Sequence, residues 1–169
     1  YTFEKILFKF SKINFNSNFL EIKKQKDNFI VKGNLKNKKD KINNDKIFLI
    51  LNDTLKNFDF SNTSFKSISE FSFDINKKFK IKNLKINSKL SLDKLILQPN
   101  LYKIRNYIKD YNNLLNFKEN KLNIKYSKKE FFIDGSSEIY IDANSKSLIK
   151  NKIKKSKNKT NFETFLNLD

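Results

Sequence analysis

Residues Phe79–Leu97 read FKIKNLKINSKLSLDKLIL, and their pattern indicates the fold class. The apolar residues of this stretch recur at every second position, which is the period of a β-strand with one dry face. The apolar positions change parity near Asn83 and again near Asp93, and we interpret the changes as bulges or short turns in one long ribbon or in two successive strands. Lysine, asparagine and serine fill most of the alternate positions, so the opposite face of this stretch is polar and basic.

The same alternation appears on both sides of this stretch. Phe29–Leu35 and Phe71–Ile75 precede it, and Leu122–Tyr126 and Phe131–Ile141 follow it. The chain has only two glycines and one proline, which favours long strands joined by Asn, Asp, Lys and Ser turns. We therefore predict a mainly β fold of long antiparallel strands in a twisted, curled and open sheet.

One segment departs from the period of two. From about Asn100 to Asn116, apolar residues recur at spacings of three and four, which predicts one amphipathic helix that begins after Pro99. A helix that caps an open end of the sheet is the preferred interpretation, and a helix that lies on a membrane is the alternative.

A hairpin pattern occurs twice. Ile22–Gly33 and Ile124–Gly135 align without a gap at an offset of 102, with five identities in twelve positions. The two glycines of the chain occupy the same aligned position. Chance similarity in a biased composition is the alternative to a repeated hairpin, and repeats of one such unit typically build an elongated array.

The chain forms one β-rich segment, 1–169, without a convincing domain boundary. Two Lys/Asn-rich stretches, 36–46 and 150–159, have few apolar residues and are predicted to be mobile connections. Because the first residue is Tyr1, we expect a fragment of a longer protein built from repeats.

The charge is strongly positive, with 36 Lys and Arg against 18 Asp and Glu. A surplus of +18 suggests a polyanion or an anionic membrane as partner. However, Arg105 is the only arginine, and Lys, Asn, Ile and Phe are the residues that an AT-rich genome favours. The positive charge therefore reflects nucleotide bias as well as any selection for an anionic partner.

Absent residues exclude most catalytic chemistry. The chain has no His and no Cys, which removes histidine bases, cysteine nucleophiles and the usual zinc ligands. Asp134, Glu138 and Asp142 are evenly spaced along the polar side of a predicted strand, where solvated acids are the simpler interpretation. We predict no enzyme, no metal site and no cofactor, and the longest apolar run, Ile47–Leu51, is too short for a membrane-spanning helix.

The dry face of such a sheet must be covered, either by folding into a sandwich or by curling into a trough that accepts an apolar ligand. Basic strands with interleaved aromatic residues also fit single-stranded nucleic acid. A single arginine argues against this alternative, as does the phase of the aromatic residues, which coincides with that of Ile and Leu.

Phe79–Leu95, the predicted helix, Leu122–Tyr126 and Phe131–Ser136 together resemble the AsmA-like family of envelope proteins, the YhdP and TamB type, from AT-rich alphaproteobacteria. The likeness is clearest from about Asn14 to Asp142. It implies a periplasmic portion of an inner-membrane-anchored protein whose repeating β-groove conveys phospholipid between the inner and outer membranes. The anchor is not in this segment, and the family has no catalytic residues to transfer.

The resemblance and the alternation together give the candidate site. We predict non-enzymatic lipid handling, with phospholipid acyl chains and bacterial membranes as partners and no specific nucleic acid. The alternatives are an envelope scaffold domain with a closed β core and a basic single-stranded nucleic-acid-binding β domain. The predicted groove-lining residues are Phe71, Phe73, Ile75, Ile86, Leu90, Leu92, Ile124, Phe131, Ile133 and Ile139.

Overall fold

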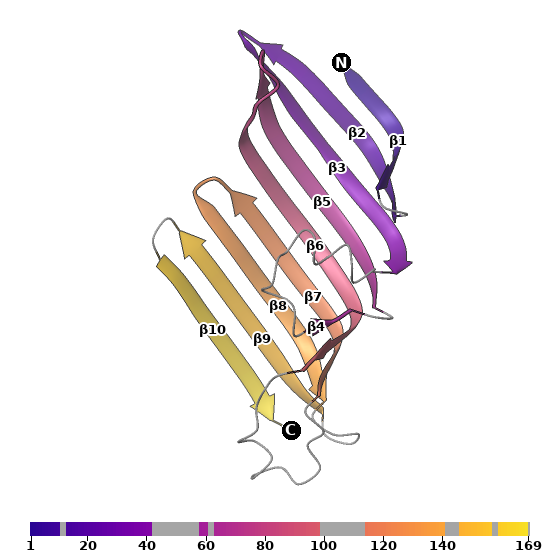
Figure 1. Cartoon of the computed structure of the whole chain (residues 1–169), viewed down its shortest axis with the longest axis vertical. Coiled ribbons are helices and arrows are strands. Elements are labelled where there is room, and N and C mark those ends of the chain that lie inside the picture. Colours follow the sequence, from indigo (N-terminus) through magenta and orange to yellow (C-terminus); the bar gives the residue numbers. More distant parts are fainter. Residues whose placement is uncertain are drawn as a thin grey trace.

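A computed structural model describes residues 1–10, 13–41, 58–60, 63–98, 114–140, 146–156 and 159–168 (Figure 1). Every regular element within these residues is a β-strand, as the alternation predicted. The strands are β1 (Thr2–Phe10), β2 (Ile13–Gln25), β3 (Asn28–Lys41), β4 (Phe58–Asp59), β5 (Ser64–Asn76), β6 (Ile81–Leu97), β7 (Leu115–Ser127), β8 (Glu130–Tyr140), β9 (Lys146–Ser156) and β10 (Lys159–Leu168).

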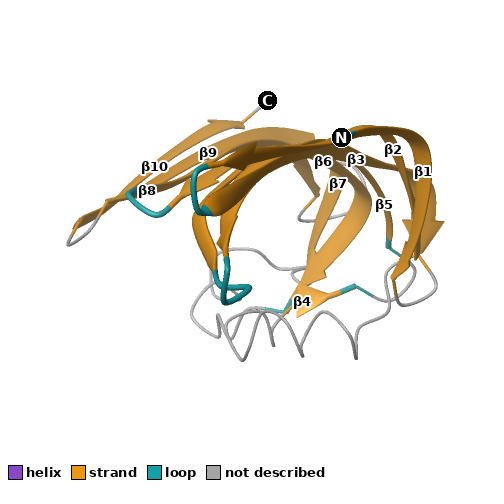
Figure 2. Cartoon of the chain, turned by 90° about the horizontal axis from the view of Figure 1, so that it is seen from above, coloured by secondary structure: helices purple, strands orange, loops and turns teal. Residues whose placement is uncertain are grey.

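The strands form one antiparallel sheet in the order β1-β2-β3-β5-β6-β7-β8-β9-β10, and the short β4 pairs with the end of β6. The order follows the chain, so each long strand pairs with its neighbours in sequence. The sheet arches along its width (Figures 1 and 2). It does not close into a barrel, because β1 and β10 lie at opposite edges and do not pair with each other. The predicted open antiparallel sheet is confirmed.

Phe79–Leu97 forms a single long strand from Ile81 onward, and its two parity changes have different origins. Near Asn83 the pairing with β5 shifts between Ser72 and Asp74, and Asn83 has a φ of 53°. The predicted bulge at Asn83 is therefore confirmed. Near Asp93 the pairing of β6 with β7 keeps its register but skips Asp93 and the opposite Glu119, which has a φ of 48°. At the same place β7 has one residue more than β8.

Asparagines accompany the bulges. Four register shifts interrupt the pairing of the described strands, and beside each lies an asparagine with a hydrogen-bonded side chain: Asn34, Asn37, Asn83 and Asn120. A bulge leaves backbone groups out of the ladder, and burial of such a group without a partner is costly. The side chains of Asn34, Asn37 and Asn120, which both donate and accept, pair with such backbone groups, whereas Asn83 donates to the Asp74 carboxylate at 2.6 Å.

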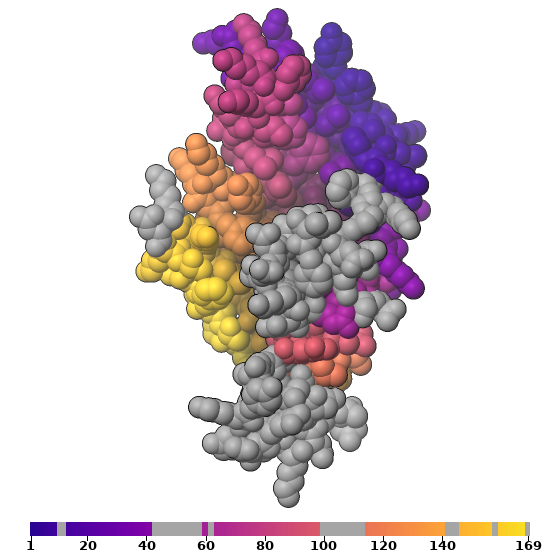
Figure 3. All heavy atoms as spheres, in the orientation of Figure 1, coloured from indigo at the N-terminus to yellow at the C-terminus, as the bar shows by residue number. Residues whose placement is uncertain are grey.

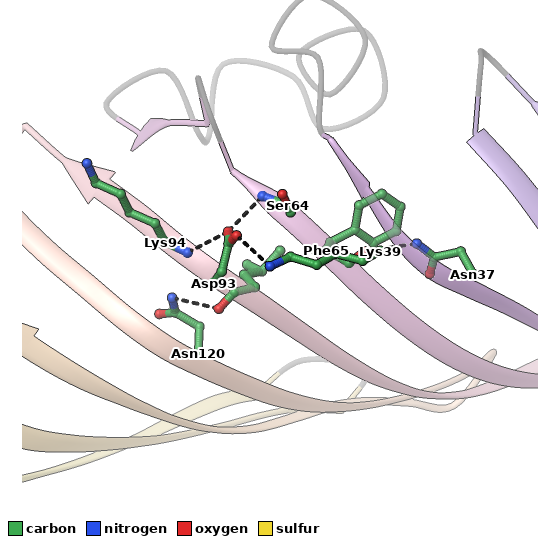
Figure 4. A network of polar contacts seen from close by, with 8 residues as sticks. Asn37, Lys39, Ser64, Phe65, Asp93, Lys94 and Asn120 are labelled. Atoms are coloured by element: carbon green, nitrogen blue, oxygen red, sulfur yellow. Dashed lines mark hydrogen bonds and ion pairs between the residues drawn. The ribbon is translucent and has the colours of Figure 1, made fainter.

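Asn37 illustrates the arrangement (Figure 4). Its side chain is 2% exposed, and its Oδ1 accepts hydrogen bonds from the Ser67 backbone N–H and from the Ser67 hydroxyl, both at 2.6 Å. Its Nδ2 donates to the Phe65 carbonyl oxygen at 2.9 Å. These bonds join β3 to β5 across the shift between Asn37 and Asp40.

The two aligned segments form hairpins with the same register. In both, a leucine pairs with the glycine, Leu20 with Gly33 and Leu122 with Gly135. The register shift also falls at the same place, with one extra residue in the first strand between the pairs Asn16–Lys36 and Leu20–Gly33, and between the equivalent pairs of β7 and β8. Over 13–36 and 115–138, nine aligned positions are identical. The sequence match therefore corresponds to a repeated hairpin.

The predicted helix lies mostly outside the described residues, which omit 99–113. Its end is wrong, because Leu115 and Asn116 are the first residues of β7. They pair with Leu97 and Ile96, the last residues of the long β6. Pairing with an already extended strand thus determines the backbone here, and the helical spacing does not.

The predicted mobile connections are wrong wherever the structure describes them. Residues 36–41 belong to β3, 150–156 to β9 and Lys159 to β10, while 42–46 and 157–158 lie outside the described residues. Backbone hydrogen bonds to two neighbours hold β9, and Ile153 pairs with Ile133 and Phe162. The lysines of such a strand extend into water, so a lysine-rich composition does not prevent strand formation.

Candidate functional site

Strand register places the apolar residues of different strands on one face of the sheet. Directly paired residues of neighbouring strands point to the same face. One continuous row of paired residues crosses nine strands in the order Phe3, Leu20, Gly33, Phe71, Ile86, Tyr126, Phe131, Lys155 and Thr160. The next row contains Leu35, Ser69, Ser88, Ile124, Ile133, Ile153 and Phe162. This face is predominantly apolar.

The apolar face lies on the inside of the arch. Tyr1 and Ile22 exchange two backbone hydrogen bonds, of 2.9 and 2.8 Å, so the peptide groups of Ile22 point toward β1. In Figure 1, β2 runs upward with β1 on its right, and for L-residues in this arrangement the Ile22 side chain points toward the viewer. The viewer's side of Figure 1 is the concave side in Figure 2. We call this the inner face and the opposite one the outer face.

All ten predicted groove-lining residues lie on the inner face, on the four central strands β5 to β8. Their pairings include Phe71 with Ile86 and Ile124 with Ile133. The rings of Phe71 and Phe73 are stacked, with centroids 5.9 Å apart. Leu92 and Ile139 are buried, whereas the other eight are only half-buried. The structure therefore brings the ten together as one partly accessible surface.

The inner face is wider than the sequence predicted. It also includes Leu122 of β7, and it continues onto the strands on either side of the four central ones. The apolar residues that these strands add are Leu20, Ile22, Val31, Ile149, Ile153, Phe162 and Leu166. In β9 the alternating residues Ile149, Asn151 and Ile153 are the sequence signal for this face, but the lysine-rich composition of the strand makes the signal hard to recognise.

Polar side chains on the inner face bond with one another. The Ser69 and Ser88 hydroxyls lie 2.8 Å apart, and the Thr164 hydroxyl donates to Asn151 Oδ1 at 2.9 Å. Pairing of this kind removes most of the cost of placing a hydroxyl on an apolar surface. These residues therefore interrupt the apolar surface without introducing a charge.

The two glycines lie on the inner face beneath larger side chains. A Cβ on Gly33 would lie 2.8 Å from Phe71 Cζ and 3.1 Å from the carbonyl oxygen of Phe19. A Cβ on Gly135 would lie 2.6 Å from Leu122 Cδ2. At both places the absence of a side chain lets the neighbouring residue lie flat across the strand, which keeps the inner surface shallow.

The outer face is basic. On the central strands it presents many lysines, and a shallow groove there is bordered by Lys32, Lys85, Lys125 and Glu70. At one end of β8, Glu138 accepts from Lys146 at 2.6 Å and from the Tyr140 hydroxyl at 3.0 Å. These bonds lower the pKa of Glu138, and the same carboxylate raises the pKa of Tyr140. Such exposed pairs contribute little to stability.

Asp93 connects β6 to the first residue of β5 (Figure 4). Its Oδ1 accepts from the Ser64 and Lys94 backbone N–H groups at 2.7 and 2.8 Å, and its Oδ2 lies 3.4 Å from Lys39 Nζ. Partial burial opposes ionisation, but the hydrogen bonds from Ser64, Lys39 and Lys94 outweigh it and lower the pKa of Asp93. The interaction is structural, because it secures the start of β5.

No cluster of carboxylates in the described part of the chain has the geometry to hold a metal ion. The described residues also contain no helix that is long and apolar enough to cross a membrane. No family model, curated protein or solved structure matches the chain. The arrangement that remains as a candidate site is the inner face itself, which can bind apolar groups by contact.

Proposed function

We propose that this protein handles lipid without catalysis, and that its inner face binds phospholipid acyl chains. The observation that carries the proposal is the accessibility of the central inner-face residues. In a closed β core, Phe71, Phe73 and Ile133 would be fully buried, but all three are half-buried. Contiguous exposed apolar surface of this kind is typical of a binding site.

The curvature supports the same proposal. The arch places the apolar residues on its concave side, where the opposing slopes of the sheet can contact an acyl chain from several directions (Figure 2). Burial of apolar surface contributes about 25 cal/mol per Å², so several half-buried side chains provide a substantial driving force. The lysines of the outer face point away from this surface and remain in water.

The resemblance to AsmA-like envelope proteins extends the proposal to the cellular setting. It suggests a periplasmic groove that conveys phospholipid between the inner and outer membranes. The repeated hairpin supports this extension, because a repeated unit lengthens a sheet and its apolar face together. An envelope scaffold with a closed core is the alternative.

Nucleic-acid binding is less well supported. Base stacking and phosphate neutralisation require aromatic and cationic side chains on the same surface. On the central strands the aromatic residues lie mainly on the inner face, as Phe71 and Tyr126 do, while Lys85, Lys89 and Lys121 lie on the outer face. A sheet with this division does not combine the two functions.

Native mass spectrometry of the purified protein tests the proposal. We expect bound phospholipid in the wild type and its loss in Phe73→Gln. Ile68→Gln is the matched control, because Ile68 lies on the outer face of the same strand and is 41% exposed. Lipid retained by Phe73→Gln, or a wild type that never carries lipid, would contradict lipid handling and favour the closed-core scaffold.

A further inference from the structure

β10, drawn in yellow in Figure 3, is an edge strand of the described sheet. Within the described residues it pairs only with β9, through ten consecutive residues without a register shift. An edge strand offers a row of unpaired N–H and C=O groups, and proteins usually protect such edges with proline, bulges or several charges. β10 has no proline and no bulge, and its charged residues are Lys159 and Glu163 alone.

Large apolar side chains accompany this open backbone. Phe162 is 70% exposed, Phe165 59% and Leu166 50%. Phe162 and Leu166 lie on the inner face, in the rows of Ile153 and Ile149, while Phe165 lies on the outer face. A strand added at this edge would therefore cover apolar surface on both faces.

The hydrogen-bond pattern shows which residues of β10 face the open edge. The backbone groups of inner-face residues bond across the strand pairs β1–β2 and β3–β5. The Tyr1–Ile22 bonds show this for the first pair, and the Ser67 N–H, which points toward β3, shows it for the second. Because this pattern alternates from strand to strand, inner-face residues also bond within the pairs β6–β7 and β8–β9. The inner-face residues of β10, the ninth strand in the order, therefore have no partner strand in the described sheet. The backbone groups of Phe162, Thr164 and Leu166 therefore point outward.

Strand direction then selects the partner. Because nine strands alternate in direction, β1 and β10 run the same way, and joining β10 of one copy to β1 of the next would give a parallel pair (Figure 1). Two β10 strands related by a two-fold axis form an antiparallel pair, and isologous two-fold contacts are the commonest in soluble oligomers. Lys5, with a φ of 53°, also makes β1 the less regular edge.

We propose that β10 pairs with β10 of a second copy of this chain, with the two-fold axis at Thr164. In this register Phe162 lies opposite Leu166 of the second copy, and Thr164 lies opposite its counterpart. Moving the axis by one residue to Glu163 would place two like charges opposite each other, which is unfavourable. The pairing keeps both inner faces on the same side, so the apolar surface continues from one copy to the next.

The pairing is tested by sedimentation equilibrium of the 169-residue chain, and it stands independently of lipid binding. We expect a concentration-dependent dimer of twice 20.2 kDa for the wild type. Phe162→Lys should shift the protein to monomer, whereas the control Leu7→Lys, at a 76% exposed residue of the opposite edge, should leave the dimer intact. A wild type that is monomeric at every concentration would overturn the proposal, as would equal effects of the two variants.

Disulfide trapping tests the register and does not depend on the stability of Phe162→Lys. The chain has no cysteine, so each variant carries one thiol. Directly opposed antiparallel residues have Cα atoms about 5.5 Å apart or closer, within disulfide range. Thr164→Cys should form a covalent dimer on mild oxidation, and Asn161→Cys, which faces Asn167 of the second copy, should not. Equal trapping at both positions, or none at Thr164→Cys, contradicts the assigned register.

Discussion

The hairpins β2–β3 and β7–β8 share a register, a bulge position and a leucine–glycine pair, but different contacts hold them in place. In the first hairpin, Asn34 accepts from the Asn18 backbone N–H at 2.8 Å. In the second, the buried Asn120, which is equivalent to Asn18, donates to the carbonyl oxygens of Leu92 and Phe117. The pairing pattern is therefore the property that repeats, and different side chains hold the bulge in each copy.

Asn120→Ala should have the largest effect on this comparison. Asn120 is 3% exposed, and its loss removes the bond to the Leu92 carbonyl oxygen, so we expect destabilisation of about 2 kcal/mol. Asn18→Ala, at the equivalent but exposed position, should change stability by less than about 0.5 kcal/mol. Urea unfolding followed by circular dichroism measures both. Equal losses would show that the two bulges are held in the same way.

The two glycines should also respond differently. Gly33→Ala should cost about 1–2 kcal/mol, because the new Cβ meets a rigid ring and a backbone oxygen. Gly135→Ala should cost less than about 1 kcal/mol, since the nearest atom belongs to a leucine side chain that can rotate away. Thermal unfolding of the pair gives the comparison. A larger loss at Gly135 would contradict the packing described for the inner face.

The turns of the hairpins give a smaller difference of opposite sign. Lys26 has a φ of 53°, whereas Lys128 does not have a positive φ. Glycine relieves the cost of a left-handed conformation, so Lys26→Gly should stabilise the protein by about 0.5–1 kcal/mol. Lys128→Gly should instead be neutral or slightly destabilising. Unfolding midpoints in urea distinguish the two, and a stabilising Lys128→Gly would contradict the assigned turns.

The carboxylate of Asp93, beside the second hairpin, should make the protein sensitive to acid, and this effect is the smallest. Asp93 lies opposite Glu119 at the β7 bulge, whereas Ile6 of β1, which does not titrate, lies opposite Ser17, the residue of β2 that is equivalent to Glu119. Because the folded pKa of Asp93 is lowered from 3.8, its stabilisation is complete above that pH and is lost as the pH falls through the folded pKa.

The Ser64 amide reports this titration. Its NMR resonance should shift with a midpoint below 3.8 in the wild type and should show no such step in Asp93→Asn. A midpoint at or above 3.8 would show that the hydrogen bonds to Asp93 do not favour the carboxylate.

The sequence was sufficient for the fold class, because the alternation of Ile86, Leu90 and Leu92 has one simple structural meaning. The sequence was also sufficient to predict that the ten candidate residues share one face, because apolar and polar residues alternate regularly in the strands that contain them. Strand limits were less predictable. Leu115 and Lys150 belong to strands because of pairing with partners that are distant in sequence, and local composition does not contain that information.

The asparagines show a second limit. Nucleotide bias explains why the chain is rich in asparagine, yet Asn37 and Asn120 are buried and bonded to backbone groups beside bulges. Their role depends on where the register shifts, and the register is a property of two strands together. The spacing of asparagines along one strand therefore gives no signal for it.

Site-specific photocrosslinking shows directly which face of the sheet contacts acyl chains. A benzophenone amino acid at Phe73 lies on the inner face, and one at Phe132, also half-buried, lies on the outer face of the sheet. We expect irradiation in phospholipid vesicles to yield a lipid adduct, identified by mass, at Phe73 and little or none at Phe132. Equal labelling of both positions, or labelling of Phe132 alone, would contradict acyl-chain binding on the inner face.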